Sequence, residues 1–161
     1  MHRLLTASLL TLFLSSSAWA GQPNIGGMKR VFSQMKTALE KNNEKLFKKQ
    51  WLPSSYAKNL VGGSGLPGQA VFKQGSRKGW YLKAQMKRIR SIPGQKGAPW
   101  IVPTLIWSDA KKRALDEIFM LLIHRNKRWM VLGGGEKLSQ VEALGRRYVN
   151  KKPLAPPKGK K

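Results

Sequence analysis

Residues 114–135 read ALDEIFMLLIHRNKRWMVLGGG, the most apolar run of the chain once its N-terminal segment is set aside. This stretch predicts a β-hairpin, with one strand over residues 115–124, a turn at 126–127 and a return strand over 129–132. Such a run should lie at the centre of the hydrophobic core, because burial of apolar surface is the main driving force of folding.

The turn fixes the register of this hairpin. A two-residue loop at Asn126 and Lys127 pairs Arg125 with Arg128 and His124 with Trp129. Asparagine tolerates the positive φ that such a turn requires.

The first strand of the hairpin is apolar on both faces. Alternation along a strand separates its side chains into two sets, Leu115, Phe119, Leu121 and Ile123 on one face and Ile118, Met120 and Leu122 on the other. A strand of this kind is covered on both sides. The expected covers are a helix over residues 28–50 on one side and, on the other, either the C-terminal helix or a second copy in a homodimer through the sheet.

The rest of the chain gives an α+β pattern, with N-terminal helices packed on a curved antiparallel sheet of about four to five strands and a C-terminal helix. Apolar spacing predicts helices over 28–50, 56–60 and 138–148 and strands over 69–73, 80–92 and 100–108. Proline cannot donate to a β ladder, so Pro103 favours an edge strand or a bulge. The glycine-rich loop over 62–68 lacks the GxxxxGK[ST] pattern of a phosphate cradle.

The first twenty residues have the form of an export signal. One arginine precedes an apolar stretch of secretory length, and small residues surround a cleavage point after Ala20. The expected organisation is a signal peptide (1–20), one domain (21–149) and a basic disordered tail (150–161). The expected location is the periplasm or the extracellular space. No transmembrane segment is expected in the mature chain, because the apolar run of the leader is shorter than a bilayer requires and no second apolar run of that length follows.

The net charge predicts polyanionic partners. The chain has 31 Lys and Arg against 7 Asp and Glu, and loss of Arg3 with the signal leaves 30 − 7 = +23. Solubility alone requires a magnitude of only about 2–8. There is no cysteine, hence no disulfide framework. Outside the cytoplasm, the expected partners are an anionic envelope polymer, a lipid surface or an acidic protein.

The element order resembles the nuclear-transport-factor-two-like superfamily. The resemblance covers residues 28–134 and rests on the amphipathic start, the junction at Trp51 and Tyr56 and the closing DEIFMLLIHRNKRWMVLGGG hairpin. It implies a cone with a pocket between helices and sheet. Members include isomerases, hydratases, ligand binders and non-catalytic domains, so the resemblance does not choose a function.

Residues suited to catalysis are few. Asp116, Glu117 and His124 are the candidates, and Asp116 and His124 share one strand face with an apolar stretch between them. Eight residues of strand hold the two apart by roughly 26 Å, which is too far for cooperation on one small substrate. One histidine in the mature chain and no cysteine argue against a transition-metal site, and no cofactor is expected.

Cations interleaved with aromatic residues suit phosphate-bearing partners and ring stacking. The aromatic contacts expected are Trp80, Tyr81 and Trp129. The expected anion-binding residues are Arg77, Lys78, Lys83, Lys87, Arg88, Arg90, Arg125, Lys127, Arg128, Arg146 and Arg147. Individually, each could equally be part of a diffuse solvated face.

Three functions follow as hypotheses. The first is an exported, strongly cationic, non-enzymatic envelope protein that binds an anionic polymer, a lipid headgroup or an acidic protein. The second is a pocket protein of the nuclear-transport-factor-like kind, either a small-ligand carrier or an isomerase or hydratase. The third is a membrane-active cationic toxin, suggested by the basic amphipathic first helix.

Overall fold

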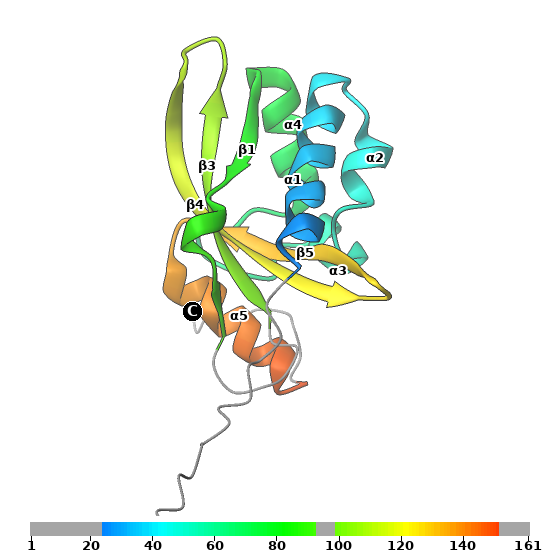
Figure 1. Ribbon diagram of the computed structural model, residues 1–161, viewed down its shortest axis with the longest axis vertical. Coiled ribbons are helices and arrows are strands. Elements are labelled where there is room, and N and C mark those ends of the chain that lie inside the picture. The colour runs from blue at the N-terminus through cyan, green and yellow to red at the C-terminus, as the bar shows by residue number, and fades with distance from the viewer. Residues whose placement is uncertain (1–23, 93–98, 152–161) are drawn as a thin grey trace, which may run out of the picture.

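The computed structural model describes residues 24–92 and 99–151. Within them the predicted fold class is confirmed: N-terminal helices pack on a curved antiparallel sheet, and one helix follows it (Figure 1). The elements are α1 (Ile25–Glu40), α2 (Glu44–Lys48), α3 (Pro53–Ala57), α4 (Gly68–Lys78), β1 (Trp80–Ala84), the 3-10 helix η1 (Met86–Arg88), β2 (Arg90–Ser91), β3 (Trp100–Ser108), β4 (Arg113–Arg125), β5 (Arg128–Gly135) and α5 (Leu138–Val149). The predicted signal peptide, the turn over 93–98 and the tail from residue 152 lie outside the described residues.

The sheet is built around β3 and β4. Its order is β1-β3-β4-β5, with every pair antiparallel, and β2 also pairs with β3. The short strands β1 and β2 therefore lie end to end along one edge of β3, with η1 between them. The predicted single strand over 80–92 is thus two strands interrupted by a helical turn.

Pro103 lies in an interior strand, because β3 pairs with β4 on one side and with β1 and β2 on the other. The Gln85 N–H donates to the Pro103 carbonyl over 2.8 Å. The N and C=O of one strand residue face the same neighbour, so the Pro103 nitrogen faces the break between β1 and β2. The expected edge position was wrong, and the ladder is interrupted in the neighbouring strand.

The predicted hairpin is confirmed with its register. Arg125 pairs with Arg128 and His124 with Trp129, and the turn residues Asn126 and Lys127 have φ of 51° and 61°. The return strand is longer than predicted and runs through the glycines. A Cβ on Gly133 would lie 2.7 Å from a methyl group of Leu144, so glycine there lets α5 approach β5 closely.

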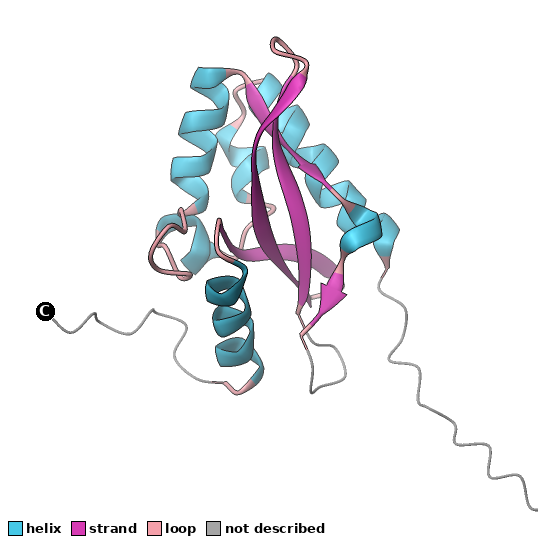
Figure 2. Ribbon diagram, turned by 90° about the vertical axis from the view of Figure 1, so that its left-hand side faces the viewer, coloured by secondary structure: helices cyan, strands magenta, loops and turns pink. Residues whose placement is uncertain are grey.

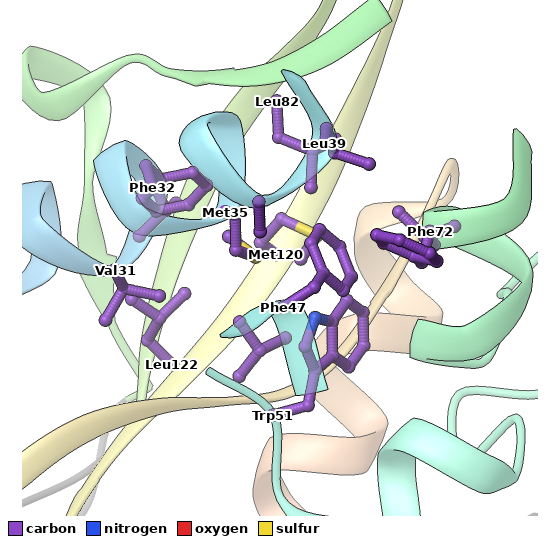
Figure 3. Close-up of a cluster of buried hydrophobic side chains, with 14 of the residues drawn as sticks. Val31, Phe32, Met35, Leu39, Phe47, Trp51, Phe72, Leu82, Met120 and Leu122 are labelled. Carbon is purple, nitrogen blue, oxygen red and sulfur yellow. The ribbon is translucent and has the colours of Figure 1, made fainter. Parts of the chain in front are cut away.

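Both faces of β4 are buried over residues 120–123, as the alternation predicted, whereas the strand is exposed towards Arg113 and Leu115 is 41% exposed instead of buried. Met120 and Leu122 enter one cluster with α1, α2 and α4, part of which is shown in Figure 3. Leu121 and Ile123 enter a second cluster with Leu144 of α5. The second cover is therefore the C-terminal helix. None of the helices described is long and apolar enough to cross a membrane.

The predicted long helix over 28–50 is broken. Helix α1 ends at Glu40, Asn42 takes a positive φ of 47°, and the Asn43 side chain accepts the Leu46 N–H at the start of α2. Asparagine favours both the left-handed conformation and the N-cap. The next short helix is α3 instead of residues 56–60.

The predicted strand over 69–73 was wrong, because these residues lie in α4. The buried positions are Gly68, Val71, Phe72 and Gly75, a helical spacing that brings them to one face. Pro67 precedes the helix, and Gly79 ends it with a φ of 64°. This is the usual asymmetry of proline near the start and glycine at the end of a helix.

The outer edge of β5 is covered by the chain between α2 and α3. Val131 donates to the Gln50 carbonyl, and its own carbonyl accepts the Leu52 N–H and the Ser55 hydroxyl. Pairing of this kind removes an exposed sheet edge. It also places Trp51, only 1% exposed, inside the first cluster.

The turn predicts the effect of one substitution. Replacing Lys127, at φ 61°, with glycine should raise the free energy of unfolding by about 0.5–1 kcal/mol, because it removes a left-handed penalty of about 1–2 kcal/mol at some cost in unfolded-chain entropy. Urea denaturation measures the change. Lys127→Gln removes the same charge but keeps the Cβ, so an equal gain in that variant would contradict a backbone origin.

The Tyr56 phenol donates to Glu44 Oε1 over 2.7 Å, which ties α3 to α2. Burial and then this hydrogen bond raise the pKa of Tyr56 above its ordinary range. The unfolded phenol ionises near pH 10 and the folded one only at higher pH, so the stabilisation is complete below about pH 10 and is lost as the pH rises further.

Tyr56→Phe should therefore cost about 1 kcal/mol at neutral pH, and the difference from the parent protein should shrink between about pH 9 and 11. Urea denaturation of both proteins across that range tests this expectation. A difference that stays constant with pH would show that the phenol does not remain neutral in the folded state.

Candidate functional site

One part of the sheet carries no helical cover. Helix α5 packs on β4 and β5, so the far halves of β3 and β4 and the strand β1 are open on that side; Figure 2 looks towards it. The cross-strand pairs there are Tyr81 with Trp107, Lys83 with Leu105, and Leu105 with Glu117. We call these five residues the outer face.

Two lysine ammonium groups lie over aromatic rings of this face; Lys83 belongs to the face, and Lys36 reaches it from α1. Lys36 Nζ lies 4.1 Å from the Tyr81 ring centroid, and Lys83 Nζ lies 4.2 Å from the Trp107 ring. Asp109 joins the pair, accepting the Tyr81 hydroxyl at 3.3 Å and the Trp107 indole N–H at 3.0 Å, with Lys36 at 3.9 Å. Cation–π contacts stabilise such positions, so the two charges are fixed in place.

The electrostatics keep Lys36 charged. Partial burial lowers the pKa of Lys36, but Tyr81 and the carboxylates of Asp109 and Glu40 together outweigh it, so the net pKa is raised above the usual lysine value. The ammonium therefore persists at physiological pH.

At the far border of the outer face, Glu117 accepts hydrogen bonds from Gln85, at 2.8 Å, and from Arg88. Arg88 and Glu117 also form a salt bridge. Both charges are exposed in part, so the pair adds little to stability, but it neutralises Arg88 as a ligand for anions.

The predicted anion-binding residues are not gathered at one place. Lys83 lies on the outer face, Lys87 and Arg88 in η1, and Arg77 and Lys78 at the end of α4. Arg90 and Arg146 contact Glu142 from β2 and α5, and Arg147 donates to the Leu60 carbonyl. The remaining three, at the hairpin tip, are Arg125, Lys127 and Arg128.

Two of the three predicted aromatic contacts are packing residues. Trp80 is 6% exposed and belongs to the core. Trp129 lies against His124, with ring centroids 5.1 Å apart, and against Gly27 of α1. Of the predicted set, Tyr81 alone lies on the outer face.

The candidate catalytic residues are separated, as the strand geometry predicted. His124 lies beside the hairpin turn against Trp129, whereas Asp116 lies near the other end of β4. Glu117 faces away from Asp116 and is paired with Arg88. Within the described residues, no group of three or more His, Asp or Glu could hold a metal ion.

Asp116 instead borders a cavity of about 60 Å³ between α4 and the sheet. Its wall is mostly apolar and includes Trp51, Leu66, Val71, Trp80, Leu82, Ile106, Ile118 and Met120. Apart from the indole N–H groups of Trp51 and Trp80, the polar side chains of that wall are Ser64, Gln74, Asp116 and Glu136, and no lysine or arginine of the described residues lines it.

A wider groove of about 500 Å³ adjoins this cavity. The two share Gln74, Trp80, Ile106 and Asp116, and the groove adds Lys78, Ser108, Lys111 and Leu115. Leu66 and Leu115, 42% and 41% exposed, lie at the cavity and the groove respectively. An exposed apolar rim around a hollow is typical of a binding site.

Three residues that matter here did not stand out in the sequence as a set: Lys36, Trp107 and Lys111. Trp107 lies beside Tyr81 only because of the β1–β3 register, and Lys36 reaches Tyr81 from a helix 45 residues away in sequence. The period-two pattern marks Trp107 as one face of its strand, which is the only local signal.

Comparison of the chain with protein-family models, with curated proteins and with solved structures gave no match.

Proposed function

We propose that this protein is an exported, non-enzymatic binder of an acidic polysaccharide, and that the outer face is its principal contact surface. The observation that carries the proposal is the number of cations left without a carboxylate. Six of the 31 Lys and Arg lie outside the described residues, which leaves 25. Four of these, Lys36, Arg88, Arg90 and Arg146, contact a carboxylate, and Arg147 bonds a carbonyl. The other twenty have no carboxylate of the described residues within 4.0 Å.

Two features favour a charged polysaccharide over other polyanions. The rings of Tyr81 and Trp107 already carry lysine ammonium groups, so these two rings of the outer face are less suited to stacking with nucleic-acid bases. The apolar side of α1 is buried in the core, so it offers a membrane no anchor in this conformation. Export, which the leader sequence indicates, would bring the protein into contact with acidic glycans.

The full chain should bind polygalacturonate in a salt-dependent manner and should not bind neutral dextran. Fluorescence anisotropy measures the binding of both polymers. Affinity should fall steeply between about 50 and 500 mM salt, because exposed charges are screened. Binding that ignores salt would contradict the proposal. If duplex DNA or phosphatidylglycerol vesicles bind more tightly than polygalacturonate at equal salt, the preferred partner is nucleic acid or a lipid surface, and the polysaccharide proposal is wrong.

A charge-matched pair of double variants localises the contact. Lys36→Gln with Lys83→Gln removes the two ammonium groups that lie over rings, and Lys29→Gln with Lys41→Gln removes one exposed charge from α1 and one from the residue that caps its C-terminus. The first pair should weaken binding about tenfold, equivalent to about 1.4 kcal/mol, and the second much less. Equal losses would show that binding follows net charge and has no preferred face.

A further inference from the structure

The cavity between α4 and the sheet, together with its adjoining groove, assigns a second binding site. We propose that it takes a small zwitterion with a short apolar side chain, the chemistry of an aliphatic α-amino acid. This site is separate from the outer face and does not depend on polysaccharide binding.

The charges around the two hollows are of both signs. Asp116 borders both, and among the described residues no cation lies within 4.0 Å of it. One of its oxygens accepts the Glu117 N–H at 2.7 Å, which leaves the other free for a ligand ammonium. Lys78 and Lys111 border the groove only, and neither has a carboxylate within 4.0 Å in the part of the chain that the structure describes.

A ligand of a single charge would satisfy only part of this arrangement. An anion placed between Lys78 and Lys111 would face the carboxylate of Asp116. A cation at Asp116 would face the two lysines and the strongly positive field of the whole chain. A zwitterion pairs its ammonium with Asp116 and its carboxylate with the lysines, and it loses neither contact.

The apolar cavity sets the size of the side chain. Trp51, Val71, Leu82, Ile118 and Met120 line it with apolar surface. A cavity needs about 10–15 Å³ of this kind of volume to hold one water, so about 60 Å³ accommodates only a few water-sized groups. The ligand side chain is therefore short and aliphatic, and Trp51 and Trp80 in the wall give binding a fluorescence signal.

Three small molecules that share a four-carbon chain test which charged groups of the ligand the site requires. L-norvaline carries both charges, butylammonium lacks the carboxylate, and pentanoate lacks the ammonium. Titrated into the full chain with tryptophan fluorescence as readout, norvaline should bind at least about tenfold more tightly than either partner compound. Equal or tighter binding of butylammonium or of pentanoate would overturn the assignment. A lack of norvaline binding at concentrations up to about 10 mM, weaker than a millimolar Kd, would overturn it as well.

Neighbouring carboxylates on opposite faces of β4 supply the matched variants. Asp116→Asn should weaken norvaline binding about tenfold and leave pentanoate unaffected or tighter, while Glu117→Gln should leave both within about twofold. Both positions are partly or fully exposed, so both variants should fold, and circular dichroism checks this. Equal effects at the two positions would overturn the role of Asp116. Polygalacturonate binding should survive Asp116→Asn, so failure of one proposal is distinguishable from failure of the other.

Discussion

The structure depends on one strand, β4, whose two faces must both be covered by apolar side chains. Residues Met120, Leu121, Leu122 and Ile123 of β4 are each at most 2% exposed, although alternate side chains point to opposite sides. Burying each such side chain stabilises the fold by about 1.5–3 kcal/mol, provided that something apolar lies on both sides. The N-terminal helices supply one cover and α5 the other, and the positions of all the remaining elements follow from these two packings.

Both candidate sites lie where this double cover ends. Towards Arg113 the strand β4 loses α5 on one side, which exposes the outer face with its fixed lysines. On the other side, the cavity and the groove lie between α4 and the sheet, beside Asp116. The two sites thus share the same strands, back to back, but contact different side chains because alternate residues point in opposite directions.

The hairpin was predictable because every signal for it is local. The turn residues, the alternation and the apolar run all lie within residues 114–135, and the register followed from the turn alone. The same applies to α5, with Val141 and Leu144 at helical spacing. The break after Glu40 also had a local signal in Asn42 and Asn43, but the apolar spacing continued across it and concealed the change of direction.

The candidate sites were less predictable, because they depend on pairings between distant segments. Trp80, which the sequence placed among ligand contacts, points into the core, while its neighbour Tyr81 points out. Helix α4 was concealed by its glycines, since helix propensity disfavours them and only packing explains Gly75. A Cβ there would lie 2.8 Å from Leu39, so glycine is needed for the close contact between α4 and α1. No local sequence pattern reveals this contact.

The partition of the core by the sheet has a consequence for how the molecule opens. Leu144 and Val141 seal only the cluster on their own side, and the cluster beneath α1 has no side chain from α5. Subglobal opening follows units of this kind. Release of α5 would leave the opposite half of the core packed. We therefore expect the C-terminal helix, which packs closely on the sheet at Gly133, to open as a cooperative unit of its own.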